Sequence, residues 1–405
     1  MTDDVMNSGI DSVAREFDPY DPDQVTHMHQ ALAAFRSKCP VPHSEQQKGF
    51  WLATRYDDIR QAALDHATFS SRSVMVPRDR LGPELEERPP ITLDPPRHTS
   101  FRRLLLPGFA PAQVARLEPS IRATCRTAIA AIAESAECDV VNDYAKKIPV
   151  ELICTMLGVP VSIAPTFANW VHDLVEAEEM DKAAAAGAAM AGWIAGEIEK
   201  HASEPQDDLI TLLMTSEVDG QRLSPEELVG ALLLILIGGM DTTWSVIGSM
   251  LWHLAQHPDD RARLVAEPSL IPTAVEEFLR VYSPISLARI TTTEADLGGT
   301  VIPADEVVLL SFPSGNRDET AFPDPDCVQL DRKPNRHVAF GVGQHRCIGS
   351  NIARLELQVG LEEWMSAFPD FELVAPEAVT WATGQVWGPR SAIVRFPHSK
   401  SVSRS

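Results

Sequence analysis

The chain carries few basic residues for its length. Its 405 residues include 35 lysines and arginines against 57 aspartates and glutamates, so the formal net charge is −22 at pH 7. A surface of this sign repels the phosphate groups of nucleic acids and of anionic lipids. The composition therefore argues against nucleic acid or a membrane surface as a partner and is compatible with high solubility.

Cysteines are few and scattered. No two of them form a Cys-x-x-Cys pair, which argues against a zinc ribbon or a thiol-exchange centre, and their density is too low for a disulfide framework. A reducing, cytoplasmic location fits this pattern best. The six are Cys39, Cys125, Cys138, Cys154, Cys327 and Cys347.

Long uninterrupted hydrophobic runs are also lacking. The longest, from Leu228 to Met240, is too short to span a bilayer and contains glycines, and the N-terminus is acidic rather than basic. We expect no membrane anchor and no signal peptide. Because there is no repeat and no Gly/Ser-rich linker, residues 1–405 are predicted to form a single domain, with flexible ends at about 1–11 and 398–405.

Most of the remaining sequence has the pattern of helices. Apolar residues at helical spacing, or runs of strong helix formers, predict helices over 57–64, 112–133, 149–157, 183–201, 224–255, 271–282 and 348–368. Short β-branched stretches predict strands over 50–54, 300–302, 307–311 and 392–396. Proline-rich pieces at 88–96 and 322–334 predict loops. We therefore expect a mainly α fold with small peripheral β-sheets.

One loop combines several glycines with a single cysteine. Residues 340–349 read Phe-Gly-Val-Gly-Gln-His-Arg-Cys-Ile-Gly. Gly341, Gly343 and Gly349 lack a Cβ, so the backbone can turn tightly and press against a flat partner. Cys347 precedes a predicted helix, whose free N–H groups favour a thiolate over a thiol. A thiolate held in this way is a recognised axial ligand of haem iron.

The same loop carries a family resemblance. Phe340, Gly343, Arg346, Cys347 and Gly349 match the haem-binding signature of the cytochrome P450 family position by position. Three further motifs follow the family's order: Gly238-Gly239-Met240-Asp241-Thr242-Thr243 resembles the oxygen-activating segment of its central helix, Glu277-Phe278-Leu279-Arg280 its Glu-x-x-Arg motif, and Arg332 the basic partner of that motif. The resemblance spans at least 94–349 and implies the single-domain P450 fold and haem b, iron protoporphyrin IX, with Cys347 as axial metal ligand.

Residues around Asp241 suggest how protons reach bound oxygen. Thr242 lies four residues after Gly238, so its hydroxyl can reach the Gly238 carbonyl, which would bend or open the helix. The resemblance implies that Asp241 and Thr242 are the catalytic acid and alcohol pair. Taken alone, these two residues could equally be a solvated aspartate and a core threonine.

The resemblance assigns structural and haem-binding roles to further residues. Glu277, Arg280 and Arg332 would form a buried network that holds the segment before the cysteine loop, because removal of one partner would leave a buried charge uncompensated. The haem propionates require cationic or hydrogen-bonding partners. The residues at the corresponding family positions are His98, Arg102, Arg289 and His345, and further haem contacts are expected from Gly238, Phe340, Gly341 and Gly349.

Basic residues gather near the sequences expected on the thiolate side of the haem, against the acidic background. Such a patch would steer an acidic electron-transfer partner into contact. By family analogy that partner would be a ferredoxin supplied by an NAD(P)H-dependent reductase. Part of the patch could instead be occupied by the propionates and the Glu277 network. Its members are Arg102, Arg103, Arg332, Lys333, Arg336, His337 and Arg346.

The expected substrate contacts are largely apolar, which favours a small-to-medium hydrophobic organic molecule. Many of these residues could equally belong to the core. They are Val74, Met75, Val76, Leu234, Ile237, Gly238, Ile285, Leu287, Ala288, Val386 and Trp387. Arg78, Arg80 and Arg88 could pair with a substrate carboxylate.

These features together predict a monooxygenase that inserts one oxygen atom from O2 into a C–H bond, by hydroxylation or oxidative demethylation. A peroxide-driven enzyme is a second possibility, although it would not need Asp241 and Thr242. From another class, the chain could be a non-catalytic haem-binding sensor or carrier. A zinc site made of His337, His345 and Cys347 is a weaker alternative, since no fourth ligand is evident.

Overall fold

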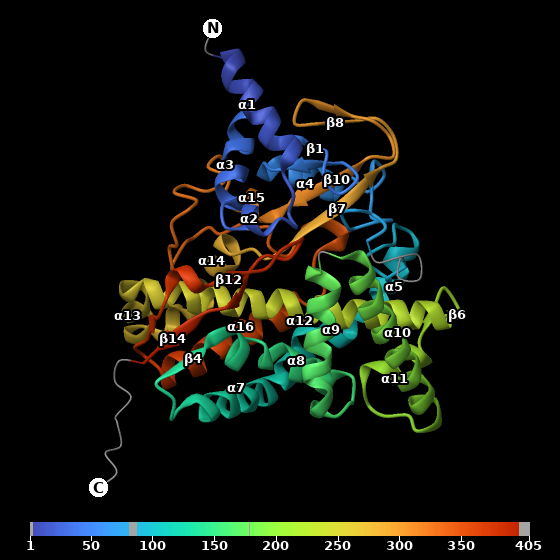
Figure 1. The fold of residues 1–405 in the computed structure, drawn as a ribbon. Helices are drawn as coiled ribbons and strands as arrows, with labels where there is room; N and C mark the ends of the chain where they lie inside the picture. The colour runs from blue at the N-terminus through green and yellow to red at the C-terminus, as the bar shows by residue number, and fades with distance from the viewer. Residues whose placement is uncertain (1–2, 81–86, 178, 397–405) are drawn as a thin grey trace.

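Helices make up most of the chain (Figure 1). The structure is a computed structural model that describes residues 3–80, 87–177 and 179–396. Its α-helices of seven residues or more are α1 (Asp3–Glu16), α3 (Met28–Lys38), α4 (Tyr56–Leu64), α5 (Arg97–Leu105), α7 (Glu118–Ile132), α8 (Lys147–Met156), α9 (Ala164–Glu176), α10 (Met180–Ser203), α11 (Leu209–Thr215), α12 (Pro225–Gln256), α13 (Pro258–Ala266), α14 (Ile271–Val281) and α16 (Ser350–Ala367).

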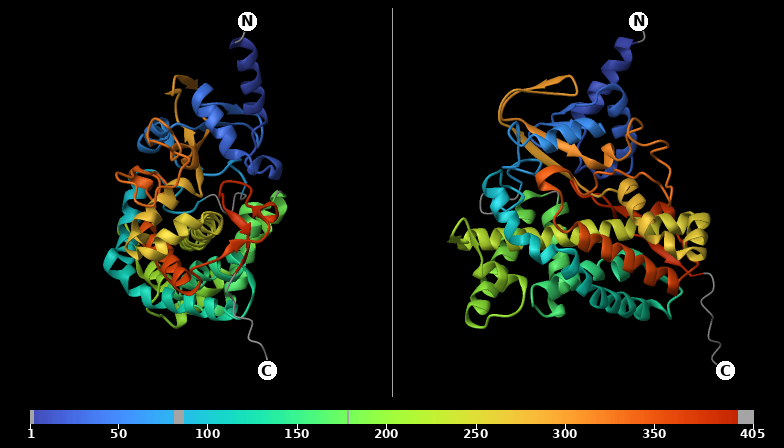
Figure 2. Two further views of the ribbon diagram at one scale, coloured as in Figure 1. Left: turned by 90° about the vertical axis from the view of Figure 1, so that its left-hand side faces the viewer. Right: turned by 180° about the vertical axis from the view of Figure 1, so that it is seen from behind.

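The longest helix, α12, runs through the centre of the molecule. Its start is fixed by a capping box, because Ser224 accepts from the Glu227 N–H at 3.2 Å and Glu227 accepts from the Ser224 N–H at 2.9 Å. By length and hydropathy alone α12 could cross a membrane, yet 67% of its most apolar 18-residue window is buried inside the protein. Figure 2, left, shows α12 nearly end-on with other helices around it. Its apolar faces therefore pack against protein.

A five-stranded sheet lies near the N-terminal helices (Figure 1). Its order is β1-β2-β10-β7-β3, with β10 parallel to β2 and antiparallel to β7. Its strands are β1 (His43–Ser44), β2 (Phe50–Ala53), β3 (Phe69–Ser70), β7 (Ser286–Thr291) and β10 (Val307–Ser311). Smaller sheets are formed by β11 (Glu372–Leu373), β14 (Ile393–Arg395) and β4 (Glu137–Asp139), by β12 (Thr380–Trp381) and β13 (Pro389–Ser391), by β5 (Glu217–Val218) and β6 (Gln221–Arg222), and by β8 (Ala295–Leu297) and β9 (Thr300–Ile302).

Alternation along β10 divides the core at this sheet. Val308 and Leu310 belong to one hydrophobic cluster, whereas Val307 and Leu309 belong to another, as expected for side chains that point to opposite faces of a strand. The largest cluster is helical and includes residues of α7, α8, α12, α14 and α16. This cluster fixes α12 beside α14 and beside α16, the helix that directly follows the cysteine loop in the sequence.

The predicted mainly α class with small sheets is confirmed, and each predicted helix overlaps an observed one. The 112–133 prediction is divided, because α6 (Pro111–Val114) and a short 3-10 turn precede α7. Among the longer elements, the sequence patterns missed α3, α9, α11, α13 and β7. Residues 3–11, predicted to be flexible, belong to α1, whereas 398–405 lie outside the described residues.

Candidate active site

A cavity of about 250 Å³ lies between α12 and the loop that precedes α16. Residues of α5, α8, α12 and β7 complete its walls, and most of the lining side chains are apolar. Cys347 faces this cavity. Glu356 of α16 is the one acidic residue among the described lining residues, and burial raises the pKa of its carboxyl well above the usual range. The site is therefore an apolar chamber with a thiol on one wall.

The glycines shape the cysteine loop at two positions. Gly341 and Gly343 have φ of 65° and 73°, in the left-handed region that favours glycine. A Cβ at Gly343 would also lie 3.1 Å from the Ala63 carbonyl oxygen. Gly349 has an ordinary φ of −78°, so its conformation does not require glycine. The Cys347 N–H donates to the Phe340 carbonyl at 2.8 Å, which closes the loop.

Cys347 is exposed to the cavity although it lies deep in the fold. Burial raises the pKa of its thiol, while the Gly349 N–H and the charges of Arg102, Arg346 and Arg354 act in the opposite direction. A metal cation at the sulfur would shift this balance, because coordination deprotonates a thiol. The surroundings thus suit a thiolate ligand.

Four cationic or hydrogen-bonding side chains meet at one end of the cavity. The rings of His98 and His345 lie 4.1 Å apart, and Arg102 and Arg289 line the same wall. Burial, followed by the charge of Arg102, lowers the pKa of His98 to about 4. Burial, followed by the charge of Arg289, lowers the pKa of His345 to about 2. The positive charges in this cluster disfavour one another, and a bound anion would stabilise them.

The polar atoms of this cluster test whether a haem fits. Both ring nitrogens of His98 and Nε2 of His345 are buried without a hydrogen-bond partner among the described residues. The nearby carboxylate of Asp94 is engaged elsewhere, since it accepts from the Ser70 hydroxyl at 2.5 Å and from the Ser71 N–H at 3.0 Å. Propionates of a haem would supply the missing acceptors, so the residues present fit that group.

The central helix presents a small, polar surface to the cavity. The Thr242 hydroxyl donates to the Gly238 carbonyl at 2.9 Å, as the spacing predicts. The expected opening of the helix is not observed. Helix α12 continues without interruption through Gly238 and Thr242. A Cβ at Gly239 would lie 2.7 Å from Ile153 Cδ1, whereas one at Gly238 would meet nothing within 4 Å. Gly239 therefore allows α8 to approach, and Gly238 leaves open space.

Asp241 is buried behind Thr242 and is not among the cavity-lining residues. Arg390 of β13 lies 2.8 Å from its carboxylate, between Nη2 and Oδ1. Burial raises the pKa of Asp241 to about 6, although the charge of Arg390 opposes this. Sequence reasoning missed Arg390, because Arg390 lies 149 positions after Asp241 in the chain and no local pattern links the two residues.

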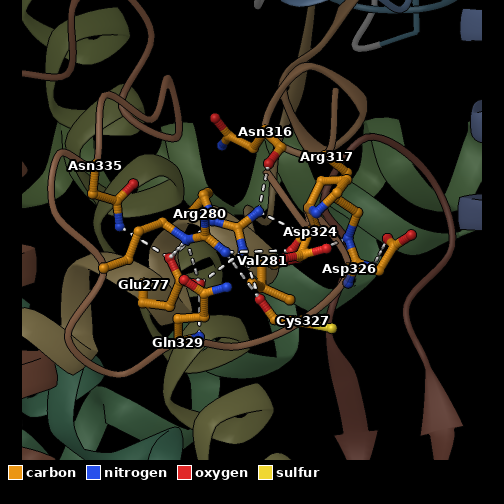
Figure 3. Close-up of polar contacts among 12 residues, drawn as sticks. Glu277, Arg280, Val281, Asn316, Arg317, Asp324, Asp326, Cys327, Gln329 and Asn335 are labelled. Atoms are coloured by element: carbon orange, nitrogen blue, oxygen red, sulfur yellow. Dashed lines mark hydrogen bonds and ion pairs between the residues drawn. The ribbon is translucent and has the colours of Figure 1, made fainter. Parts of the chain in front are cut away.

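The Glu277, Arg280 and Arg332 side chains form one buried network (Figure 3). Arg280 donates to both oxygens of Glu277, at 2.8 and 2.7 Å, and Arg332 Nε donates at 2.9 and 3.1 Å. The Gln329 N–H and the Asn335 amide also donate to this carboxylate, at 2.9 and 3.1 Å. The network fixes the polypeptide that leads into the cysteine loop.

A second network lies beside the first and was not predicted. Glu276 pairs with Arg354 at 2.6 Å and with His337 at 3.0 Å, and Arg354 lies over the Phe340 ring at 4.5 Å. Burial opposes the effect, but the hydrogen bonds from His337 and Arg354 lower the pKa of Glu276 to about 2. These contacts join α14 and α16 to the first residue of the cysteine loop.

Only some of the predicted substrate contacts lie at the cavity. Leu234, Gly238, Ile285 and Leu287 line it. The other predicted residues lie outside the lining and have core or partly buried positions; they are Val74, Met75, Val76, Ile237, Ala288, Val386 and Trp387. Lining residues that sequence reasoning did not name include Pro89, Ile91, Leu152, Ile153, Met156 and Val246.

The three arginines considered for substrate binding lie outside the lining. Arg78 pairs with Asp305 at 3.2 Å, and Arg80 donates to the Ala177 carbonyl at 2.5 Å. Arg88 is buried, which lowers the pKa of its guanidinium to about 10. Two of these side chains therefore serve contacts within the protein.

The predicted basic patch is divided between internal contacts and the surface. Arg332 and His337 are engaged by Glu277 and Glu276, and Arg102 donates to the Arg346 carbonyl at 2.5 Å. The remaining members are exposed; they are Arg103, Lys333, Arg336 and Arg346. No group of three His, Cys, Asp or Glu side chains within the described ranges could hold a metal ion, so the zinc alternative finds no support.

Comparisons with known proteins identify the family to which this fold belongs. The family profile described as Cytochrome P450 matches residues 176–379. A vitamin D(3) 25-hydroxylase of Pseudonocardia autotrophica is 37% identical and covers 85% of this chain and 87% of its own. A steroid C26-monooxygenase of Mycobacterium tuberculosis is 36% identical over 86% of this chain and 89% of its own. The structure of the cytochrome P450 PksS of the Bacillus subtilis bacillaene polyketide synthase matches with a TM-score of 0.86 at 29% identity, over 94% and 99% of the two chains.

The fold and the cysteine-walled cavity define a protein that holds haem through a thiolate. The chain belongs to the cytochrome P450 family, and it is a monooxygenase of the bacterial type. Members of this class oxidise organic substrates with O2 and electrons from redox partners. The sensor and carrier alternatives are therefore set aside.

Proposed function

We propose that this protein hydroxylates or oxidatively demethylates a neutral, predominantly apolar organic molecule at a haem b held by Cys347. The observation that carries the proposal is the cavity, where a thiol faces apolar walls beside two arginines and two buried imidazoles. The bound haem supplies oxygen activation. The names of the two relatives given above refer to vitamin D(3) and to steroids, and both kinds of molecule are largely apolar.

The protein's own residues divide the remaining work. Cys347 would hold the iron, and His98, Arg102, Arg289 and His345 would hold the propionates, whose charge would compensate that of the two arginines and whose oxygens would accept hydrogen bonds from the imidazoles. Phe340, Gly341 and Gly349 would bound the haem on the thiolate side. These residues bind and orient the haem, so their replacement should affect haem retention before it affects substrate choice.

Thr242 and Asp241 would manage protons on the opposite side. The Thr242 hydroxyl is held by the Gly238 carbonyl at 2.9 Å and borders the cavity, so it can position a water or oxygen there. Asp241 stands behind it with a pKa of about 6, raised by burial, which suits a group that releases a proton near neutral pH. Because an intact acid and alcohol pair is present, we favour O2-driven turnover over a peroxide-driven reaction.

Substrate would bind against the apolar part of the lining. Leu234, Ile285 and Leu287 are joined there by Leu152 and Ile153 of α8. Apolar contacts supply most of the binding energy in such a chamber, and a charged substrate would lose hydration without a partner. We therefore expect neutral ligands to bind more tightly than their carboxylate analogues.

Electrons would arrive at the thiolate side from a ferredoxin reduced by an NAD(P)H-dependent reductase. The exposed cations Arg103, Lys333, Arg336 and Arg346 support this, since they stand out on a protein of net charge −22. We propose a cytoplasmic location, and a single haem-binding domain because the main hydrophobic cluster joins residues from Val25 to Phe396.

The carbon monoxide spectrum of the reduced protein tests the proposal. The wild-type protein should show the long-wavelength Soret band of thiolate-ligated haem, and Cys347→His should lose that band and show a histidine-type carbonyl spectrum instead. Retention of the band in Cys347→His would show that another residue holds the iron. A wild-type protein that binds no haem would refute the proposal as a whole.

A further inference from the structure

One edge of strand β7 is only partly covered by a neighbouring strand. On this edge β3 pairs with Ile290 and Thr291 alone, so the N–H and C=O groups of the preceding residues need other partners. The side chains of Ile285 and Leu287, which come from this preceding stretch, line the cavity. Whatever holds the uncovered part of the edge therefore also sets the position of part of the cavity wall.

A single buried side chain joins this edge to another segment of the chain. Gln385 lies between β12 and β13, and only 6% of it is exposed. Its Nε2 donates to the Ser286 carbonyl at 2.9 Å and to the Val74 carbonyl at 3.0 Å. Its Oε1 accepts from the Val76 N–H at 2.8 Å. Both amide N–H groups and the amide oxygen are used, so one side chain connects three segments that lie far apart in the sequence.

Backbone hydrogen bonds strengthen the same junction. The Ser286 N–H donates to the Gln385 carbonyl at 2.9 Å, and the Ala288 N–H donates to the Val74 carbonyl at 2.9 Å. Ser286 and Ala288 flank Leu287, whose side chain points to the opposite face of the strand from theirs. These bonds therefore fix the stretch of backbone from which Leu287 reaches the cavity.

The geometry of this junction selects a primary amide. Two backbone carbonyl oxygens face Nε2 and one N–H faces Oε1, so the side chain must present two donors and one acceptor in one planar group. An ionised carboxylate would place an oxygen against both carbonyl oxygens. An aliphatic side chain would leave the Ser286 carbonyl and the Val76 N–H without these partners. The junction therefore weakens when Gln385 is replaced, even by a residue of equal size.

We propose that Gln385 is a positioning residue that sets the shape of the substrate-binding wall formed by Ile285 and Leu287. Its amide holds the partly covered edge of β7 against the segment 74–76, so the apolar wall keeps one position when an organic molecule binds. Gln385 is not among the described residues that line the cavity. Its contribution is therefore to selectivity among apolar ligands and not to the oxidation itself. The inference rests on the proposed function, in which this wall contacts the substrate.

The test compares two probes that bind ferric haem through the same kind of nitrogen donor. Imidazole is small, whereas 4-phenylimidazole carries one additional apolar ring, so the ratio of their dissociation constants reports the contacts of that ring with the cavity walls. Both constants are measured from the shift of the Soret band when the haem-loaded protein is titrated. In Gln385→Glu the ratio should change by roughly fourfold or more in favour of imidazole, the factor that loss of about one buried methylene gives. Haem content and imidazole binding should stay close to those of the wild type.

Two further variants supply the reference and the control. Leu287→Ala removes wall contacts directly and should change the ratio in the same direction. In the double variant with Gln385→Glu, the combined effect on the binding free energy should be smaller than the sum of the two, because both act on one wall. Gln256→Glu is the matched control, since the exposed Gln256 amide also donates to a backbone carbonyl, that of Trp252 at 3.1 Å, and does not line the cavity. It should leave the ratio unchanged.

The outcomes separate this inference from the proposed function. An unchanged ratio in Gln385→Glu would overturn the inference, as would an equal change in Gln256→Glu or full additivity with Leu287→Ala. Parallel weakening of both probes in Gln385→Glu would also overturn it, because the loss would then concern the whole haem pocket and not selectivity. A wild-type Soret band that does not respond to imidazole would instead contradict the proposed function, since the haem iron would be out of reach of a ligand.

Discussion

Two buried carboxylates in this molecule face arginine, and they are bonded very differently. Glu277 accepts hydrogen bonds from Arg280, Arg332 and the Gln329 N–H, and also from Asn335, so its oxygens are fully used. Asp241 faces a single guanidinium among the described residues, that of Arg390, whose Nη2 lies 2.8 Å from Oδ1.

We infer from this difference that Glu277 supports the fold, whereas Asp241 is suited to the proton chemistry proposed above. A carboxylate with complete hydrogen bonding is stabilised in its ionised form and holds its neighbours in place. A buried carboxylate with fewer partners has a raised pKa, because burial disfavours its charged form. Its protonation state can therefore change near neutral pH. A carboxylate paired with arginine thus serves the fold in α14, and we propose that in α12 it serves proton transfer.

Loss of the Glu277 carboxylate should give the largest effect. Glu277→Gln leaves the Arg280 and Arg332 guanidinium groups buried without a counter-charge, which typically costs about 3–5 kcal/mol. We expect a large fall in the free energy of unfolding and in haem content, measured by denaturant titration and by the pyridine haemochrome assay. The control is Asp331→Asn, which removes an exposed pair with Arg263 and should change the free energy of unfolding little, because exposed ion pairs contribute little to stability. Equal losses in the two variants would contradict the architectural role of Glu277.

Loss of the Asp241 carboxylate should spare the fold and impair turnover. Asp241→Asn keeps the side-chain volume but removes the acid, so we expect coupled product formation to fall by about 10². The ratio of product formed to O2 consumed and the solvent deuterium isotope effect report this directly. Asp173→Asn, which breaks a surface pair with Lys182, should leave both unchanged. Full coupled turnover in Asp241→Asn would place the proton donor elsewhere.

The smallest expected effect is a change in the pH dependence of the free energy of unfolding, and it distinguishes a carboxylate with strong partners from Asp241. Glu276 has a folded-state pKa of about 2, below its ordinary value of 4.5, so its contribution is complete above pH 4.5 and is lost as pH falls toward 2. Asp241 has the opposite sign, because its pKa rises from 3.8 to about 6 and its unfavourable contribution grows as pH increases through that window.

Glu276→Gln should therefore destabilise the protein by roughly 1–3 kcal/mol at pH 7 and by less near pH 3. Asp241→Asn should change stability in the favourable direction above pH 6, apart from the charge it leaves on Arg390. Unfolding free energies measured from pH 3 to pH 7 check both signs. A Glu276→Gln deficit that does not shrink in acid would show that the lost contacts are not electrostatic.

Local sequence patterns were enough for several of the helices, including the longest one, and for the cysteine loop. Amphipathic spacing predicts α12, α14 and α16, and glycines at 341 and 343 predict a loop that only unusual backbone angles allow. The Thr242 bond to Gly238 also follows from a separation of four residues. Such features depend on neighbours within a turn or two of chain, so the sequence by itself determined them.

Tertiary structure alone decided which distant residues meet. Arg390, Glu176 and Asp241 lie on three elements far apart in the chain, and no periodicity links them. The same holds for the cavity walls, where Leu152 and Ile153 face the site while Val76 and Ala288 are enclosed in the core. A side chain of a given residue type can lie in the core, line the cavity or form an ion pair, because the packing of whole helices determines its surroundings. Adjacent residues therefore determine the shape of the cysteine loop. The raised pKa of Asp241, in contrast, depends on burial and charges that arise only when α9, α12 and β13 pack together.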